Sequence, residues 1–390
     1  MKSSRGPREI PLAIPLAIPI PIALAIIVSA LALLGASRAS ARPLYATRTG
    51  MACGRCHVDP AGGGVRAQTG FLYAWNGHTI TPAEEREPVL DPRIADGLRF
   101  GADVRSVYLQ SEDQLPSDRS SFFLMEATVH VAADLNDRLT LVYSNDQGAV
   151  AETYGLIRSL PLSASLKVGR FKPAFGLEVE DHSTFTRDSL GFGPNAYDTG
   201  AAVTFTPRNV QVDLALTNGR LGLPGFDDND QKAVTGRAAW FRDWIGFGAS
   251  GFFDTGRLNT GERGRTYRYG AFGQLHRGPV VLLAEYDRLT NDPDHGSSVD
   301  GEAGFVQGWY EIRPSISLTA KYDRFDPDLD LAETGRDRVS AGIESDLLPL
   351  LRLEAYARGT RIYGFDDEGR RRYGENHDVF DLIAMLYLSF

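Results

Sequence analysis

The stretch Leu98–Tyr108, LRFGADVRSVY, alternates apolar and polar side chains along its length. Two faces result, with Leu98, Phe100, Ala102, Val104 and Tyr108 on one and Arg99, Gly101, Asp103 and Arg105 on the other. A repeat of two residues is the period of a β-strand that has one apolar and one polar face. Phe123–Val131 and Ile316–Tyr322 repeat the pattern, with Phe123, Met125 and Val129 expected on one apolar face.

The same unit of about ten residues followed by a turn continues to the end of the chain, as in membrane barrels. The sequence therefore predicts an all-β domain over residues 91–390. Its sixteen expected strands are 98–109, 121–133, 137–145, 149–158, 163–172, 198–206, 209–217, 231–241, 244–253, 266–276, 279–289, 302–312, 315–325, 335–345, 350–362 and 376–390.

The connections between these strands differ in length in a regular way. Most odd-numbered connections are long, such as 173–197 and 363–375, whereas even-numbered ones are tight, such as Pro207-Arg208. Long loops that alternate with short turns over an even number of strands are typical of outer-membrane barrels. The terminal Phe390, with apolar residues at alternate positions before it, resembles the recognition signal of outer-membrane assembly. We predict a 16-stranded antiparallel outer-membrane β-barrel in contact with outer-membrane lipid.

The first 41 residues have the three parts of a secretory signal peptide. Lys2, Arg5 and Arg8 precede the apolar run Ile22–Leu34, and small residues end the segment at Ala41. The competing interpretation is a transmembrane anchor. The whole chain has a net charge of −9, which disfavours binding to nucleic acid.

Directly after this segment, Cys53-Gly54-Arg55-Cys56-His57 has the spacing of a c-type haem attachment motif. Two thiols at this spacing can form thioethers to one porphyrin edge, and His57 then becomes the proximal iron ligand. These are the only two cysteines of the 390 residues. A thioredoxin-like redox pair, a zinc site and a structural disulfide are the competing interpretations.

The second axial ligand is less determined by the sequence. We expect a short α-helix over 65–76, with Gly77 in a left-handed conformation and His78 emerging from that turn as the possible distal ligand. Met51 and a vacant sixth position are the alternatives. The haem segment, residues 42–90, has few large apolar side chains and cannot easily fold alone. It should therefore lie in the barrel lumen or at its periplasmic mouth.

The polar strand faces should line the lumen, and they carry charges of both signs. Their members include Arg105, Glu126, His130, Lys167, Arg268, Glu285, Lys321, Asp323, Arg352, Glu354 and Arg358. The connection 173–197 is a candidate constriction or metal-docking loop through Glu178, Glu180, Asp181, His182 and Arg187. An ordinary solvated loop is the alternative. No acid–base dyad or nucleophile triad is apparent, so no catalytic residue is expected.

Thr49–His57 and Asn76-Gly77-His78, together with the porin pattern, resemble the fused monohaem cytochrome–porins. That family includes outer-membrane iron oxidases and extracellular electron-transfer porins. The resemblance implies one covalent haem c that passes single electrons. The partners it implies are an extracellular donor or acceptor, such as Fe(II), and a periplasmic cytochrome or other redox carrier. A diffusion porin with an accessory haem is the alternative.

Overall fold

A computed structural model gives the fold of residues 43–78, 88–113, 119–223, 227, 229–242, 244–258, 262–365 and 371–390. The predicted signal peptide, 1–41, and residues 79–87 of the predicted haem segment lie outside these described residues. Residues 37–390 form one compact unit, to which all of the elements described belong.

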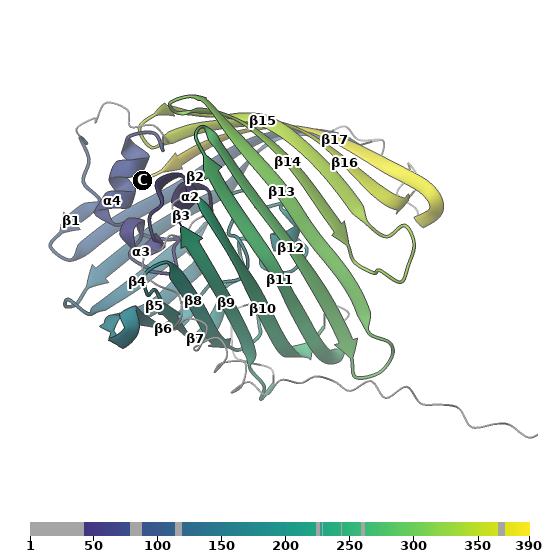
Figure 1. The fold of residues 1–390 in the computed structure, drawn as a ribbon, viewed down its shortest axis with the longest axis horizontal. Helices are drawn as coiled ribbons and strands as arrows, with labels where there is room; N and C mark the ends of the chain where they lie inside the picture. The colour runs from purple at the N-terminus through teal and green to yellow at the C-terminus, as the bar shows by residue number, and fades with distance from the viewer. Residues whose placement is uncertain are drawn as a thin grey trace, which may run out of the picture. The chain divides into compact units, whose positions relative to one another are not determined.

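Within the described residues, sixteen strands each pair antiparallel with the next, and the last pairs with the first (Figure 1). The strands are β2 (Leu98–Asp113), β3 (Arg119–Asp134), β4 (Leu139–Asp146), β5 (Ala149–Leu160), β6 (Ala164–Phe171), β7 (Asp198–Phe205), β8 (Val210–Thr217), β9 (Ala233–Arg242), β10 (Ile245–Arg257), β11 (Arg263–Arg277), β12 (Val280–Pro293), β13 (Val299–Arg313), β14 (Ile316–Asp326), β15 (Arg336–Leu348), β16 (Leu351–Phe365) and β17 (Arg371–Ser389).

The closing seam joins β17 to β2, with Met385 opposite Val107 and Leu388 opposite Val104. A closed sheet has no edge strand and satisfies its backbone hydrogen bonds internally, as a membrane-spanning sheet must. The prediction of a 16-stranded antiparallel barrel is therefore confirmed.

Several strands continue further toward the long loops than the sequence predicts. β12 extends to Pro293 instead of 289, and β17 begins at Arg371 instead of 376. The alternation of polarity fades where both faces of a hairpin meet water, but the ladder of backbone hydrogen bonds continues. Sequence periodicity therefore marks the apolar band of the barrel better than it marks the strand ends.

The barrel is apolar outside and polar inside. Val306 and Leu386 point outward and are 54 % and 46 % exposed, whereas the inward-pointing Lys321 and Glu354 are 5 % and 3 % exposed. This arrangement inverts that of a soluble protein and suits a barrel surrounded by lipid. The interior residues predicted from the strand pattern are found on this inner face.

One predicted face assignment is wrong. The register of β2 and β3 shifts between Arg105, opposite Glu126, and Ser106, opposite Leu124. This β-bulge reverses the faces of the residues that precede it on β3, so that Phe123 lies opposite the buried Val107. Phe123 therefore does not share the outer face with Val129, as the uninterrupted pattern suggested.

The structure also contains short elements that the strand pattern did not predict. β1 (Arg93–Ala95) pairs with the start of β2 across a turn at Asp96-Gly97. The helices are α2 (Pro43–Thr49), α3 (Cys53–Cys56), α4 (Gln68–Trp75), α5 (Phe185–Asp188) and the 3-10 turn η1 (Pro161–Ser163).

No helix in the described ranges is long and apolar enough to span a membrane.

Two segments pack against the inner wall of the barrel. We call residues 43–78 the N-terminal segment and residues 172–197, between β6 and β7, the long loop. Leu44 and Cys53 of the N-terminal segment form one buried apolar cluster with Leu177 of the long loop. Wall residues complete this cluster, among them Phe241, Phe272, Val281, Leu283, Phe305 and Trp309.

Candidate functional site

The attachment motif folds as a single helical turn followed by a chain reversal. The N–H of His57 donates to the carbonyl of Cys53 at 2.8 Å, and His57 then forms an antiparallel bridge with Arg66. Between them the chain turns through Gly62, Gly63 and Gly64, whose φ angles are 95°, 80° and 59°. Three successive left-handed residues are accessible only to glycine without strain. The Gly-Gly-Gly run thus shapes the loop beside the motif.

The helix predicted over 65–76 begins later, at Gln68, because Val65 and Arg66 take part in this reversal. Its C-terminal end agrees with the prediction. Gly77, at φ 79°, donates to Ala74 O at 3.0 Å, and His78 N donates to Tyr73 O at 3.1 Å. These two bonds form a Schellman motif, which ends the helix and directs His78 away from it.

Helix α4 approaches the attachment motif closely at one glycine. A Cβ on Gly70 would lie 2.1 Å from the carbonyl oxygen of Cys56. Only a residue without a side chain allows this approach, which sets the distance between α4 and the turn that carries Cys56.

The four predicted haem residues meet at one cavity. Cys53, Cys56, His57 and His78 all line it, together with Met51. Its other lining residues are Tyr45, Ala46, Thr49, Ala52, Arg66, Gly70 and Tyr73. Sequence separation alone does not require His78 to face the motif, so this convergence is a result of the fold.

The competing metal and disulfide arrangements are not found here. No disulfide joins Cys53 to Cys56, and Cys53 Sγ lies 3.4 Å from Ala61 O. Among the described residues, no group of three or more His, Cys, Asp or Glu side chains is arranged to hold a metal ion by itself.

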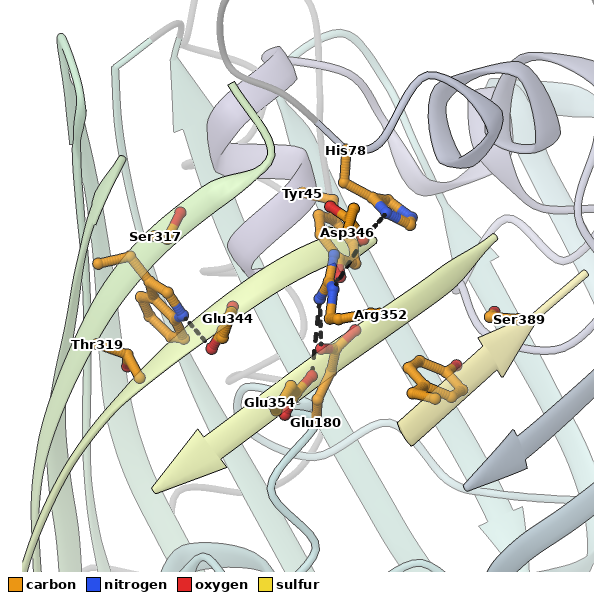
Figure 2. Close-up of polar contacts among 12 residues, drawn as sticks. Tyr45, His78, Glu180, Ser317, Thr319, Glu344, Asp346, Arg352, Glu354 and Ser389 are labelled. Carbon is orange, nitrogen blue, oxygen red and sulfur yellow. Dashed lines mark hydrogen bonds and ion pairs between the residues drawn. The ribbon is translucent and has the colours of Figure 1, made fainter. Parts of the chain in front are cut away.

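His78 is held on several sides (Figure 2). Its ring stacks on Tyr45 at a centroid distance of 4.6 Å and meets the edge of Tyr73 at 5.3 Å. Its Nδ1 lies 3.5 Å from Asp346 Oδ1 on β15, so Nε2 is the ring nitrogen on the opposite side. Burial lowers the pKa of His78 to about 4, and the imidazole is therefore neutral at neutral pH.

The side chains that line this cavity are of the types that bind a c-type haem. Two thiols and an adjacent histidine face a second, neutral histidine whose other ring nitrogen points to a carboxylate, a common arrangement behind metal-bound histidines. The open volume between them is about 30 Å³, room for one or two water molecules. A porphyrin would require this space to widen.

Buried polar contacts attach the N-terminal segment to the wall. Asp59 forms a 2.5 Å ion pair with Lys167 on β6 and accepts a hydrogen bond from Tyr154 on β5 at 3.2 Å. Arg66 donates to Ser389 O, at the end of β17, at 2.8 Å. Removing one member of a buried pair leaves the other charge uncompensated, so these contacts specify where the segment docks.

The end of the N-terminal segment meets the short turns of the barrel. A Cβ on Gly77 would lie 2.5 Å from Ser315 Oγ in the β13–β14 turn. Phe71 packs with Leu350 of the β15–β16 turn and meets Phe390 at a ring distance of 5.7 Å. The candidate cavity is thus near the end of the barrel that carries the short turns.

Three of the five residues predicted in the long loop contact the barrel wall. Glu180 pairs with Arg352 at 3.2 Å, Asp181 pairs with Lys321 at 3.0 Å, and His182 Nε2 lies 3.3 Å from Arg105. The other two bond within the loop: Glu178 pairs with Lys172 at 2.9 Å, and Arg187 donates to Phe175 O. The loop therefore folds onto the inner wall.

Electrostatics fix the charge states of two of these residues. Burial opposes ionisation of Asp181, but Lys321 and Arg358 hold the pKa of its carboxyl well below the usual range. Burial and the neighbouring Arg105 lower the pKa of His182 to about 3. At neutral pH the loop therefore presents an anionic Asp181 and a neutral His182.

The sequence did not single out several residues that shape the site. Tyr45, Asp59, Gly70 and Asp346 belong to no motif, and their roles depend on contacts between residues far apart in the chain.

No protein-family model and no curated protein matches this sequence. Solved structures with a similar fold are outer-membrane proteins. An anion-selective porin from Comamonas acidovorans has a TM-score of 0.60 at 9 % identity, covering 75 % of this chain and 99 % of that one. OmpT of Vibrio cholerae has 0.58 at 14 %, covering 76 % and 100 %. The channel DcaP of Acinetobacter baumannii has 0.54 at 12 %, covering 75 % and 97 %. At these identities the likeness establishes a porin fold.

Gly70→Ala should loosen the N-terminal segment while the barrel remains folded. The added methyl group would lie 2.1 Å from Cys56 O, and overpacking of this kind costs about 1–3 kcal/mol. We expect faster tryptic cleavage at Arg55 and Arg66, with unchanged heat-modifiable migration of the barrel. Gly54→Ala is the matched control, because its Cβ would lie 3.4 Å from Pro60 Cα. Wild-type protease resistance in Gly70→Ala would contradict the close packing.

Proposed function

We propose that this protein transfers single electrons across the outer membrane through one c-type haem, attached at Cys53 and Cys56 and ligated by His57. The observation that carries the proposal is the convergence of the attachment motif and His78 on one cavity within the interior of a closed barrel. When bound, the haem supplies a metal centre that holds or releases one electron.

The protein's own residues would bind and orient that group. Cys53 and Cys56 would hold the porphyrin edge through two thioether bonds. His57, which follows Cys56 directly, would be the proximal iron ligand, and His78 would be the distal one. Asp346, 3.5 Å from His78 Nδ1, orients the ring so that Nε2 faces the cavity.

The barrel provides the position in the membrane. Its outward apolar faces suit lipid, and short turns in such barrels lie on the periplasmic side. We therefore assign the N-terminal segment to the periplasmic half of the lumen, where a periplasmic cytochrome or other carrier can approach it. An apolar band about 25 Å tall separates the two sides, and a redox centre inside the lumen shortens that gap for an extracellular donor or acceptor.

A diffusion porin with an accessory haem is the second candidate. It is favoured by the porin fold and by a polar cavity of about 220 Å³ between the long loop and the wall strands β2–β6. This cavity extends from the exposed Gln147 in the β4–β5 turn to Gly62, Gly63 and Gly64 beside the attachment motif. A solute could enter it, but the packed segment and loop oppose passage through the whole barrel.

Haem staining after denaturing electrophoresis tests the attachment directly. The mature wild-type band should retain haem, because thioether bonds survive denaturation, and the Cys53→Ala/Cys56→Ala variant should lose the stain entirely. Folding of the variant is checked by its heat-modifiable migration. A wild-type band without haem would overturn the proposed function, and a stained double variant would overturn the assigned cysteines.

Substitution of His78 tests the distal ligand. His78→Ala should convert the low-spin optical spectrum of the haem into that of a centre that lacks one histidine. His130→Ala is the matched control, because His130 is also buried but contacts Ser144 and Asp103 on another part of the wall. An unchanged spectrum in His78→Ala would assign the sixth position to another group, such as Met51.

Single-channel conductance separates the two candidate functions. A barrel filled by the N-terminal segment and the long loop should conduct ions poorly in a planar bilayer. A variant that lacks residues 43–78 should conduct several-fold better, because a sixteen-stranded lumen is wide when nothing fills it. Wild-type conductance equal to that of the deletion variant would favour the diffusion porin.

A further inference from the structure

A cluster of acidic side chains lies beside the candidate haem cavity (Figure 2). We call it the carboxylate cluster; it consists of Glu180 of the long loop, Glu344 and Asp346 of β15, and Glu354 of β16, grouped around Arg352. Arg352 Nη1 lies 3.2 Å from Glu180 Oε2, Arg352 Nε lies 3.1 Å from Asp346 Oδ1, and Glu354 Oε1 is 3.8 Å from Nη1.

The charges of this cluster do not balance. Four carboxyl groups surround the Arg352 guanidinium, and Arg48 near Glu344 and Arg105 near Glu180 are the other cations that act on them. Carboxyl groups still outnumber cations, and Glu344, Arg352 and Glu354 are only 7 %, 4 % and 3 % exposed. Burial of excess negative charge strongly favours a proton on one of the carboxyl groups. Other ionisable or polar groups facing the cluster are Tyr45 and Arg48 on α2, His78, Glu178 and Asp181 in the long loop, Trp309 and Glu311 on β13, and Tyr356 on β16.

Hydrogen bonds indicate which carboxyl groups share that proton. The hydroxyl of Tyr356 lies 2.5 Å from Glu354 Oε2 and 3.4 Å from Glu344 Oε1. A phenol has one hydrogen, so it can donate to only one of two carboxylates, whereas a protonated carboxyl could donate back to the phenol oxygen. Glu354 Oε1 accepts no hydrogen bond from the described residues. Glu344 Oε1 also accepts a hydrogen bond from Trp309 Nε1 at 2.8 Å. Within the pair bridged by Tyr356, Glu354 Oε1 is therefore the carboxylate oxygen that can take a proton without losing a hydrogen bond.

Three cavities that share lining residues lie between this pair, the haem site and the exposed Gln147. A cavity of about 30 Å³, room for one or two water molecules, is lined by Glu344, Glu354 and Tyr356. It shares Tyr45 with the candidate haem cavity. It also shares residues 178–181 of the long loop with the 220 Å³ polar cavity that reaches the exposed Gln147. Each of these spaces is large enough for water, and water there would bring solvent protons close to the pair.

We propose that the Glu344–Glu354 pair takes up one proton when the bound haem accepts one electron. This inference rests on the proposed function. The electron comes from an external one-electron donor, which is oxidised, and the proton comes from water in the polar cavity. One O–H bond forms on a carboxylate, and the net charge inside the barrel stays the same.

The physical reason is the cost of adding charge to a dry interior. An electron delivered near Tyr45 adds one negative charge close to carboxylates that already outnumber their counter-ions, and charges interact strongly where water is scarce. A proton on the pair compensates that charge. Asp346 is not part of the proton-accepting pair, because its carboxylate lies directly beside His78 and Arg352.

The test is a spectroelectrochemical titration of the haem in the full mature protein between about pH 5 and 9, the range in which buried carboxyl groups can titrate. The wild-type midpoint potential should fall as pH rises, because protons bind more tightly to the reduced form. The limiting slope for one proton per electron is about 59 mV per pH unit, which is a tenfold change for one electron. Glu344→Gln/Glu354→Gln should abolish the slope.

Asp213→Asn is the matched control and should keep the wild-type slope. Asp213 is also a buried interior carboxylate, but it is satisfied by Thr204, Gln211 and Arg237 away from the haem cavity. If the double variant does not fold, Tyr356→Phe keeps the ring and removes the bridging hydroxyl, and it should move the pH interval in which the potential changes. If the midpoint potential of Tyr356→Phe depended on pH in the same way as that of the wild type, the assignment to this pair would be overturned.

Two outcomes in the wild-type protein are distinguishable. A potential that is independent of pH, in a protein that carries covalent haem, would overturn this inference alone. Absence of covalent haem would overturn the proposed function together with it. A double variant that folds and retains the wild-type slope would assign the proton to another group and overturn the role of Glu344 and Glu354.

Discussion

A bilayer offers no hydrogen-bond partners, so each strand that crosses it must pair its backbone with other strands. Closure of β17 onto β2 meets this requirement, and it also determines which side chains go where. Apolar residues must face outward, and polar residues are left facing a wide interior. That interior has to be filled either by water or by protein. Here two chain segments pack against the inner wall, and both buried apolar clusters and buried ion pairs hold them there.

The buried ion pairs act as specific attachment points. Lys167 holds Asp59 of the N-terminal segment, Lys321 holds Asp181 of the long loop, and Arg352 contacts both Tyr45 and Glu180. Such pairs contribute little net stability compared with apolar packing, but loss of one partner is costly. They therefore favour one arrangement of the segments over others. The Asp59–Lys167 pair and the Arg352–Tyr45 contact help to position the chain on both sides of the cavity lined by Cys53, Cys56, His57 and His78.

Local sequence patterns predicted the strands of the barrel wall, but they did not predict how the N-terminal segment and the long loop pack inside it. The two-residue alternation in Leu98–Tyr108 and its repeats predicted sixteen strands, and it failed at Met125, where one extra residue reversed the faces. Gly77 predicted the end of helix α4 because a left-handed residue is a local requirement. The start of that helix was missed because Val65 and Arg66 pair with residues earlier in the chain. Asp59, Gly70 and Asp346 could not be found, since each matters only through a partner that is distant in sequence.

Packing around Tyr45 links the candidate haem cavity to the carboxylate cluster. Tyr45 contributes to the candidate haem cavity, to the water-sized cavity and to the contacts of Arg352, so a change of charge in one space acts on the next. A porin that admits solutes needs water throughout its lumen, whereas a redox centre needs a drier environment to tune its potential. The Tyr, Trp and Glu side chains between the candidate haem cavity and the 220 Å³ polar cavity leave room for only one or two water molecules. A space of that size excludes larger solutes, whereas the proton uptake proposed for Glu344 and Glu354 requires no more room than a water molecule.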